Sequence, residues 1–125
     1  EYIGQALSVL NYYKKMLNGR VIITGDFNWN RIWNSKKDNR FDQMRQILKD
    51  KSIQSCYHDF FKEDFGKETK PTEFHTKKFE KQYHVDYCFA SSNFKIKNVV
   101  VGDFSDWIKS SDHVPIMIAF EDNLK

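Results

Sequence analysis

Apolar side chains recur at helical spacing in two stretches of the chain. From Tyr2 to Asn18 they return every three or four residues, and Gly19 then supplies the left-handed conformation that commonly ends a helix. The stretch from Phe41 to Lys51 repeats this spacing through Met44, Ile47 and Leu48. The pattern therefore predicts one helix over residues 2–18 and another over residues 41–51.

Short runs of β-branched and aromatic residues predict strands elsewhere. Arg20–Gly25 directly follows the first helix, and its uninterrupted apolar run is typical of a strand buried on both faces. The same features predict strands over 72–76, 83–90, 94–101 and 116–120, with a basic turn over 77–82. We interpret 26–40 as a loop, 52–56 as a connection and 57–63 as a short helix. Helices first and strands behind favour an α/β fold whose second half is mainly antiparallel.

Composition narrows the class of protein. A length of 125 residues allows one domain, and 40% hydrophobic with 30% charged residues excludes both a disordered chain and a membrane-spanning one. The formal net charge of +3 is compatible with a phosphate-bearing partner, although it does not by itself indicate one. Cys56 and Cys88 have neither zinc-site nor disulfide-framework spacing, so we expect a reducing compartment, the cytoplasm.

The first group of candidate functional residues lies where the early strand ends. In an extended segment Asp26 and Asn28 would point the same way, with Phe27 anchored on the opposite side. A carboxylate and an amide would then stand together at the carboxyl end of a strand, where α/β proteins usually place their sites. Gly, Asp and Asn are also common turn residues, so an ordinary turn is the alternative.

Two later segments offer further candidates. Asp86 lies in a strand whose other face is apolar, and it needs a partner unless its own face is wet. Asp112 and His113 precede the last strand and offer a carboxylate suited to Mg²⁺ beside an imidazole that can contact a phosphoryl oxygen, or else they belong to an exposed polar loop. Together the three segments supply what metal-assisted cleavage of a phosphate ester requires.

These motifs, GDFN, HVDY and SDH, occur in the order found in the endonuclease/exonuclease/phosphatase superfamily, and the chain resembles that superfamily from its first helix to Phe120. The KPTEF stretch, Lys70 to Phe74, is similar to the family's Pro-Thr element, whose threonine, here Thr72, commonly lies near substrate. The resemblance implies a deoxyribonuclease-I-like, four-layer α/β sandwich with a mainly antiparallel sheet and flanking helices.

The resemblance also implies a role for each matching residue. Asp26 corresponds to the carboxylate that activates water, and Asn28 to the amide that holds water and phosphate. Asp86 corresponds to the carboxylate that is hydrogen-bonded to the catalytic imidazole of His113. Asp112 corresponds to a carboxylate associated with Mg²⁺, with Mn²⁺ as a substitute. The implied reaction is direct attack of water on phosphorus.

The loop after the first motif bears on the substrate. Trp29, Asn30 and Arg31 combine aromatic, amide and cationic groups that can contact bases and phosphates, which favours a nucleic acid. Alternatively, Trp29 and Trp33 cover the end of the core. A phosphatase or phospholipase acting on inositol phosphates or sphingolipids is the enzymatic alternative, and a non-catalytic binding module is the third interpretation. His58 and His75 belong to no motif, so we expect them at the surface or the edge of the core.

The resemblance further implies a domain about twice as long as this chain, with an Asn and a metal-binding Glu that have no convincing counterpart here. Glu1 in particular is not assigned as that residue. We therefore interpret residues 1–125 as one domain that forms the carboxyl-terminal portion of a larger one. Alone, it is expected to be inactive and to expose sheet faces that favour self-association.

Overall fold

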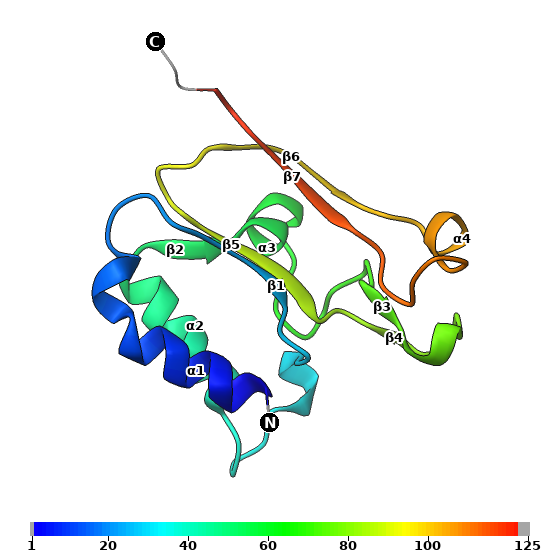
Figure 1. Cartoon of the computed structure of the whole chain (residues 1–125), viewed down its shortest axis with the longest axis horizontal. Helices are drawn as coiled ribbons and strands as arrows, with labels where there is room; N and C mark the ends of the chain where they lie inside the picture. Colours follow the sequence, from blue (N-terminus) through cyan, green and yellow to red (C-terminus); the bar gives the residue numbers. More distant parts are fainter. Residues whose placement is uncertain (1, 123–125) are drawn as a thin grey trace.

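A computed structural model describes residues 2–122, so Glu1 and the last residues of the predicted domain lie outside it. Figure 1 shows the order of its elements along the chain. The helices are α1 (Tyr2–Tyr12), α2 (Arg40–Asp50), α3 (Cys56–Phe61) and α4 (Phe104–Trp107), and the 3-10 turns are η1 (Lys14–Leu17), η2 (Arg31–Trp33) and η3 (His75–Lys77). The strands are β1 (Ile22–Asp26), β2 (Ile53–Ser55), β3 (Glu73–Phe74), β4 (Gln82–Tyr83), β5 (Asp86–Ser91), β6 (Ile96–Val101) and β7 (Ile116–Phe120).

The strands form three antiparallel sheets. The central one has the order β1-β5-β2, while β3 pairs with β4 and β6 pairs with β7. The register of the first pair places Asp26 directly opposite Asp86, at the end of both strands. This register brings together two carboxylates that are 60 positions apart in the chain, counting from 26 to 86.

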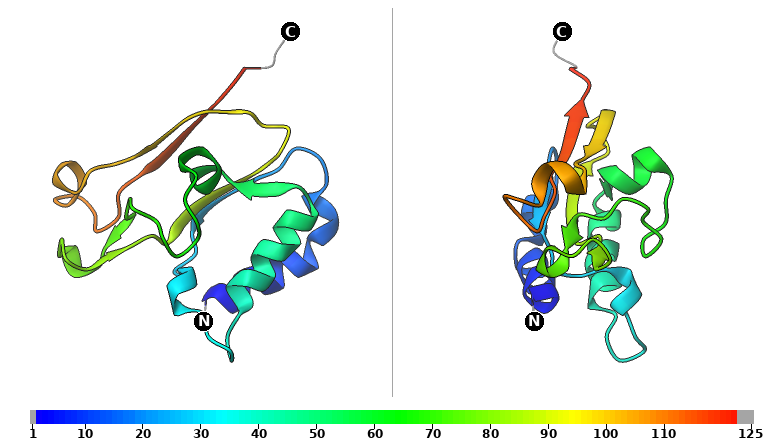
Figure 2. Two further views of the ribbon diagram at one scale, coloured as in Figure 1. Left: turned by 180° about the vertical axis from the view of Figure 1, so that it is seen from behind. Right: turned by 90° about the vertical axis from the view of Figure 1, so that its right-hand side faces the viewer.

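Alternation along β5 divides the core in two. Tyr87 and Phe89 face the helices, and Cys88 and Ala90 face the other way. Helices α1 and α2 lie side by side along the sheet (Figures 1 and 2) and fill the first core with Ile3, Leu10, Phe41, Met44 and Leu48. On the opposite side, Cys56 and apolar side chains of the β6-β7 pair cover Cys88 and Ala90. The fold is thus mixed α/β, with antiparallel sheets and flanking helices, as predicted.

The predicted helices are present with changed ends. The first ends at Tyr12 and continues as the 3-10 turn η1, before Gly19 adopts its left-handed φ of 87°. Helix α2 begins one residue before the predicted start and ends one residue before the predicted end. The predicted strand over 116–120 is β7, whereas residues 53–55, part of the predicted connection, form β2, which pairs with β5.

The prediction that the first strand is buried on both faces is wrong. Ile22 is 44% exposed, and only Ile23 of β1 is partly buried, against the helix core. The reason is that the second core covers Cys88 and Ala90 of β5 but includes no residue of β1, an edge strand that pairs only with β5 among residues 2–122. A continuous apolar run therefore did not distinguish an edge strand from a central one.

Cys56 and Cys88 are brought closer than their sequence separation indicated. Their sulfur atoms lie 3.9 Å apart in the second core, and both thiols are free and buried.

No helix in the described part of the chain is both long enough and apolar enough to span a lipid bilayer.

Candidate active site

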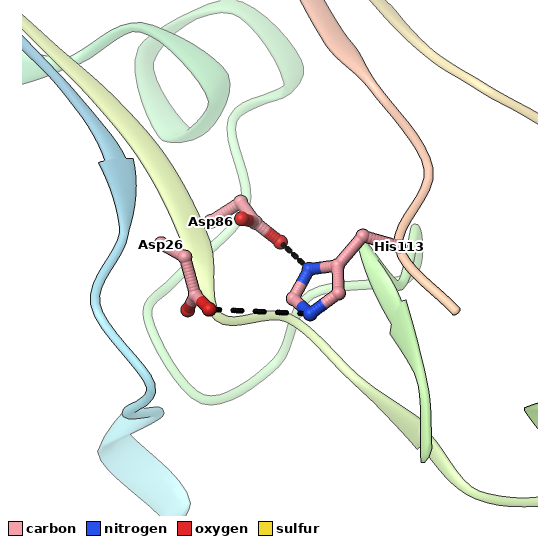
Figure 3. A group of neighbouring side chains, drawn as sticks. All are labelled: Asp26, Asp86 and His113. Carbon is pink, nitrogen blue, oxygen red and sulfur yellow. Dashed lines mark hydrogen bonds and ion pairs between the residues drawn. The ribbon is translucent and has the colours of Figure 1, made fainter. Parts of the chain in front are cut away.

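His113 lies between two carboxylates at the end of the central sheet (Figure 3). Its Nδ1 is 2.9 Å from Oδ2 of Asp86, and its Nε2 is 3.9 Å from Oδ2 of Asp26. The first distance is a hydrogen bond and the second is an ionic contact too long to be one. Because the Asp86 carboxylate can only accept, the Nδ1 proton is donated to it, and Nε2 is directed toward Asp26. The partner that the sequence predicts for Asp86 is therefore His113.

Asp26 and Asn28 are oriented by the register of β1 and by the turn that follows it. Phe27 continues the strand by donating its N–H to the carbonyl of Val85. Asn28 then adopts a left-handed φ of 48°, and its backbone N–H donates to Oδ1 of Asp26 at 2.7 Å. The extended geometry that we expected therefore ends at Phe27, and Asn28 constrains the Asp26 carboxylate through its backbone. The strand-end and turn interpretations each describe part of this segment.

The segment from Thr72 to Phe74 joins the two halves of the site. On one side the Thr72 hydroxyl accepts the backbone N–H groups of Val85 and Asp86, at 3.0 and 3.1 Å. On the other side the Thr72 carbonyl accepts the N–H of Val114, and Phe74 donates to the carbonyl of Asp112. The loop that carries His113 is thus hydrogen-bonded to the same short segment that fixes the backbone of Asp86.

The surroundings of His113 favour its charged form. Burial alone would lower the pKa of His113, but the hydrogen bond to Asp86, followed by the charges of Asp86, Asp26 and Glu73, outweighs it and raises the pKa. For Asp86 burial dominates and raises the pKa of the carboxyl, although hydrogen bonds from Thr72 and His113 oppose the shift. The two side chains are only 22–30% exposed, so their interaction is partly shielded from solvent.

A second acidic group adjoins the first. Ligand atoms of Glu73, Asp112 and His113 lie within 4.8 Å of one another, as do those of Asp26, Asp86 and His113. Carboxylate oxygens are the protein ligands that Mg²⁺ and Mn²⁺ prefer, and Mg²⁺ usually needs only one or two of them. Since His113 is engaged by Asp86, the oxygens of Glu73 and Asp112 fit such an ion best. The sequence analysis named Asp112 but missed Glu73, which directly follows Thr72 in the KPTEF stretch.

The comparison with known families identifies the chain at this point. A model of the endonuclease/exonuclease/phosphatase family matches residues 4–113, which is most of the chain and includes Asp26, Asp86 and His113. The chain belongs to this family. No curated protein and no solved structure is significantly similar to it. Family membership supports phosphoesterase chemistry in general, and divalent metal ions are the usual cofactors of the endonuclease/exonuclease/phosphatase enzymes.

Three predicted substrate-binding residues, Trp29, Asn30 and Arg31, lie away from this site. Trp29 packs against the helix core and Asn30 is 3% exposed, with its amide donating to the carbonyl of His84. Arg31 forms an ion pair with Asp42 and lines hollows formed with α2 and the 63–67 loop. Thr72 is fully buried, so its hydroxyl holds backbone rather than reaching outward. For Trp29 the alternative interpretation, covering the end of the core, describes the structure.

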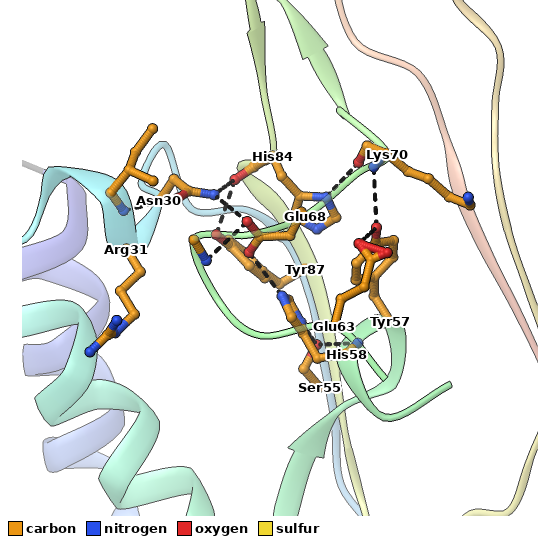
Figure 4. Close-up of polar contacts among 12 residues, drawn as sticks. Asn30, Arg31, Ser55, Tyr57, His58, Glu63, Glu68, Lys70, His84 and Tyr87 are labelled. Atoms are coloured by element: carbon orange, nitrogen blue, oxygen red, sulfur yellow. Dashed lines mark hydrogen bonds and ion pairs between the residues drawn. The ribbon is translucent and has the colours of Figure 1, made fainter. Parts of the chain in front are cut away.

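A buried polar network is centred on Glu68 and His58 (Figure 4). Oε1 of Glu68 is 2.8 Å from Nε2 of His58, whose Nδ1 is 2.6 Å from the hydroxyl of Ser55. The other oxygen of Glu68 accepts from Asn30 and from the backbone of Gly66. The prediction that His58 lies at the surface or core edge is wrong, because this histidine is only 8% exposed. No local pattern indicated its partner, ten residues away in a loop.

Proposed function

We propose that the chain supports Mg²⁺-dependent hydrolysis of phosphodiesters, as a nuclease or related phosphodiesterase. The observation that carries the proposal is His113, hydrogen-bonded to Asp86 while its second nitrogen faces Asp26. An imidazole whose pKa is raised, close to a second carboxylate, can act on a phosphoryl group and a water molecule at the same time. A binding module would have no need of this arrangement.

In the proposed reaction Asp26 orients the attacking water and accepts its proton. The water oxygen forms a bond to phosphorus as the ester bond to the leaving oxygen breaks, and the leaving oxygen takes a proton from solvent. The cationic imidazole of His113 offsets the negative charge that develops on the phosphoryl oxygens. Asp86 fixes the tautomer and orientation of that imidazole, and Asn28 contributes its side-chain amide to binding of the phosphate and the water.

Glu73 and Asp112 are the residues that would hold Mg²⁺. The bound ion supplies charge neutralisation at the phosphate. Glu73 is part of β3 and Asp112 is hydrogen-bonded to the next residue of that strand, so the two carboxylates share one backbone support. The same β3 segment also pairs with the loop that carries His113, so all three side chains depend on it.

We propose that the phosphodiester substrate is a nucleic acid. The aromatic rings of Trp33 and Tyr83 are 5.3 Å apart on the same side of the molecule as Glu73, and stacking on aromatic rings is the usual way in which proteins bind single-stranded bases. We further propose that the chain acts in the cytoplasm and as the carboxyl-terminal portion of a larger domain. Both follow from the sequence analysis, through its free cysteines and through the Asn and Glu motifs that the resemblance implies.

The test is hydrolysis of a plasmid and of single-stranded oligonucleotides by the complete protein. His113→Ala and Asp26→Asn are each expected to lower the Mg²⁺-dependent rate by about 10²- to 10⁴-fold, the usual contribution of a positioned acid or base. Chelation of Mg²⁺ with EDTA is expected to have a comparable effect. Asp59→Asn, which changes another partly exposed carboxylate on α3, is the matched control and should leave the rate unchanged. An equal rate in His113→Ala and the unchanged protein would refute the proposal.

A further inference from the structure

A hollow of about 300 Å³ lies next to the candidate active site. Side chains of three segments line it: the loop after β1, the β3-η3 strand and turn, and the strand β4 with the residue that precedes Asp86. These residues are Asn28, Trp33, Glu73, His75, Tyr83 and Val85. None of the catalytic roles proposed above uses Trp33, His75 or Tyr83.

The hollow is directly next to the candidate active site. Glu73 lines the hollow and also belongs to the acidic group with Asp112 and His113. Asn28 lines it and holds the Asp26 carboxylate through its backbone N–H. Whatever fills the hollow is therefore adjacent to a phosphoryl group held at His113.

The lining is aromatic, with polar groups at particular places. The rings of Trp33 and Tyr83 are tilted by 50° and lie 5.3 Å apart, and Trp33 leaves 38% of its surface exposed. Glu73 offers acceptor oxygens, and the side-chain amide of Asn28 makes no hydrogen bond within the described residues, so it is available as donor and acceptor. Flat apolar walls with a few hydrogen-bonding groups suit a planar ring that has a polar edge.

The charges of the lining disfavour two other kinds of ligand, an inositol phosphate and a lipid acyl chain. No Lys or Arg contributes to the hollow, and Glu73 is acidic, so a second phosphate group, as an inositol phosphate would bring, is disfavoured. An acyl chain is disfavoured because Glu73 and His75, whose Oε1 and Nδ1 lie 3.3 Å apart, would lose their hydration to an apolar ligand that offers them no hydrogen bond. A neutral heteroaromatic ring avoids both costs.

We propose that this hollow binds the unpaired nucleobase of the nucleotide next to the cleaved phosphate. The proposal rests on the proposed phosphodiesterase function and adds the residues that recognise the substrate. The base must be unpaired, because a base within a duplex does not expose the face that Trp33 and Tyr83 would contact. The substrate class is then single-stranded nucleic acid, or a strand from which one base is turned out.

The experiment compares two trinucleotides that differ by one base. Both carry a fluorophore. The second trinucleotide has a tetrahydrofuran abasic analogue in place of one nucleotide, and a separate version is made for each of its positions. Binding is followed by fluorescence anisotropy with the Asp26→Asn variant of the complete protein in EDTA, so no hydrolysis occurs. Removal of the base at one position is expected to weaken binding by about 5- to 100-fold, as expected for loss of one stacked base.

Trp33→Ala is expected to abolish the difference between the two trinucleotides, and Trp33→Phe to restore part of it, because phenylalanine keeps a stacking face. Tyr12→Ala removes a tyrosine that is 81% exposed on α1, outside the hollow, and should keep the full difference. Equal affinity of the Asp26→Asn protein for both trinucleotides at every position would refute the subsite. Tighter binding of inositol trisphosphate than of either trinucleotide, lost in Trp33→Ala, would also refute it.

The two proposals fail in different ways. Hydrolysis that depends on His113 without any preference for the base-containing trinucleotide refutes the subsite and leaves the phosphodiesterase proposal intact. Base-dependent binding that requires Trp33, without any hydrolysis that depends on His113, refutes the phosphodiesterase proposal instead.

Discussion

His113 is bound by two carboxylates that act on it in different ways. Asp86 accepts its Nδ1 proton, which fixes both the tautomer and the ring orientation. Asp26 is farther away and contributes mainly its charge. Together they keep the pKa of His113 raised in spite of its partial burial. The proposed reaction uses the charged form of this imidazole, so we expect the rate to depend on pH.

Asp86→Asn is expected to move the alkaline limb of the rate profile to lower pH. Activity that needs the cationic imidazole falls as pH rises through the pKa of His113, and removal of the Asp86 charge lowers that pKa. The stabilisation that the raised pKa brings to the folded state is likewise complete at low pH and is lost as pH rises through the folded-state value. The measurement is the rate against pH for both proteins. An unshifted limb would contradict the role of Asp86.

Sequence reasoning reached some of these residues and missed others for definite reasons. The alternation of apolar side chains around Asp86 indicated an isolated carboxylate, and hence a partner, and the SDH motif supplied His113. Glu73 was missed because its place in the site depends on the bridge between Glu73 and His113, two segments that are far apart in the chain. Thr72 resembled a residue that lies near substrate, but its burial became visible only when strands on both sides were in place.

Glu68 connects three elements. Its carboxylate accepts from His58 of α3, from Asn30 at the start of η2 and from Gly66 in its own loop. Burial would raise the pKa of Glu68, but these hydrogen bonds outweigh it and lower the pKa to about 2. Because the side chain is only 3% exposed, little solvent screens these interactions. The network thus fixes the start of the 30–33 loop that carries Trp33.

Glu68→Gln is expected to lower the free energy of unfolding at neutral pH by about 3 kcal/mol, from a pKa shift of roughly two units. A carboxyl whose folded-state pKa is depressed stabilises the protein above its unfolded value, and this contribution disappears as pH falls toward 2. The variant should therefore lose less stability on acidification than the unchanged protein. Urea denaturation at a series of pH values measures both. Parallel curves for the two proteins would argue against this ionised network.

Elements with a clear period were predictable, and those defined by their neighbours were not. Helix α2 and strand β7 follow from the spacing of their apolar residues. The short strand β2 consists of three residues and is a strand only because β5 lies next to it. The exposure of β1 was mispredicted for the same reason, since it depends on which strands the second core covers.

The first elements of the chain, α1, η1 and β1, each leave apolar side chains exposed, and we call them the apolar flank; within residues 2–122 one edge of β1 is unpaired. Helix α1 buries Ile3 and Leu10 against the core but leaves Val9 53% and Tyr12 81% exposed, and Met16 in η1 is 70% exposed. Ile22 of the edge strand is also exposed. Exposed apolar side chains next to an unpaired strand edge favour association of copies. The self-association predicted from the sequence stays a prediction, and this flank is where we locate it.

A double variant, Val9→Lys with Met16→Lys, is expected to shift the chain toward monomer by placing like charges on this flank. Sedimentation equilibrium over a wide range of concentrations measures the association constant. Met117→Lys, a change of another exposed methionine on β7, is the control and should leave association unchanged. A chain that is monomeric throughout, or that associates equally well with the lysines present, would contradict the assignment.

The short segment around Thr72 has a consequence for how activity can be lost. It is bonded on one side to the strand that carries Asp86 and on the other to the loop that carries His113, yet the large apolar cores lie elsewhere. Local opening of this one segment breaks far fewer contacts than global unfolding and therefore costs less free energy, although Thr72 itself is buried. With the proposed function, activity is therefore lost while almost all of the packing survives, and we expect heat inactivation to precede melting.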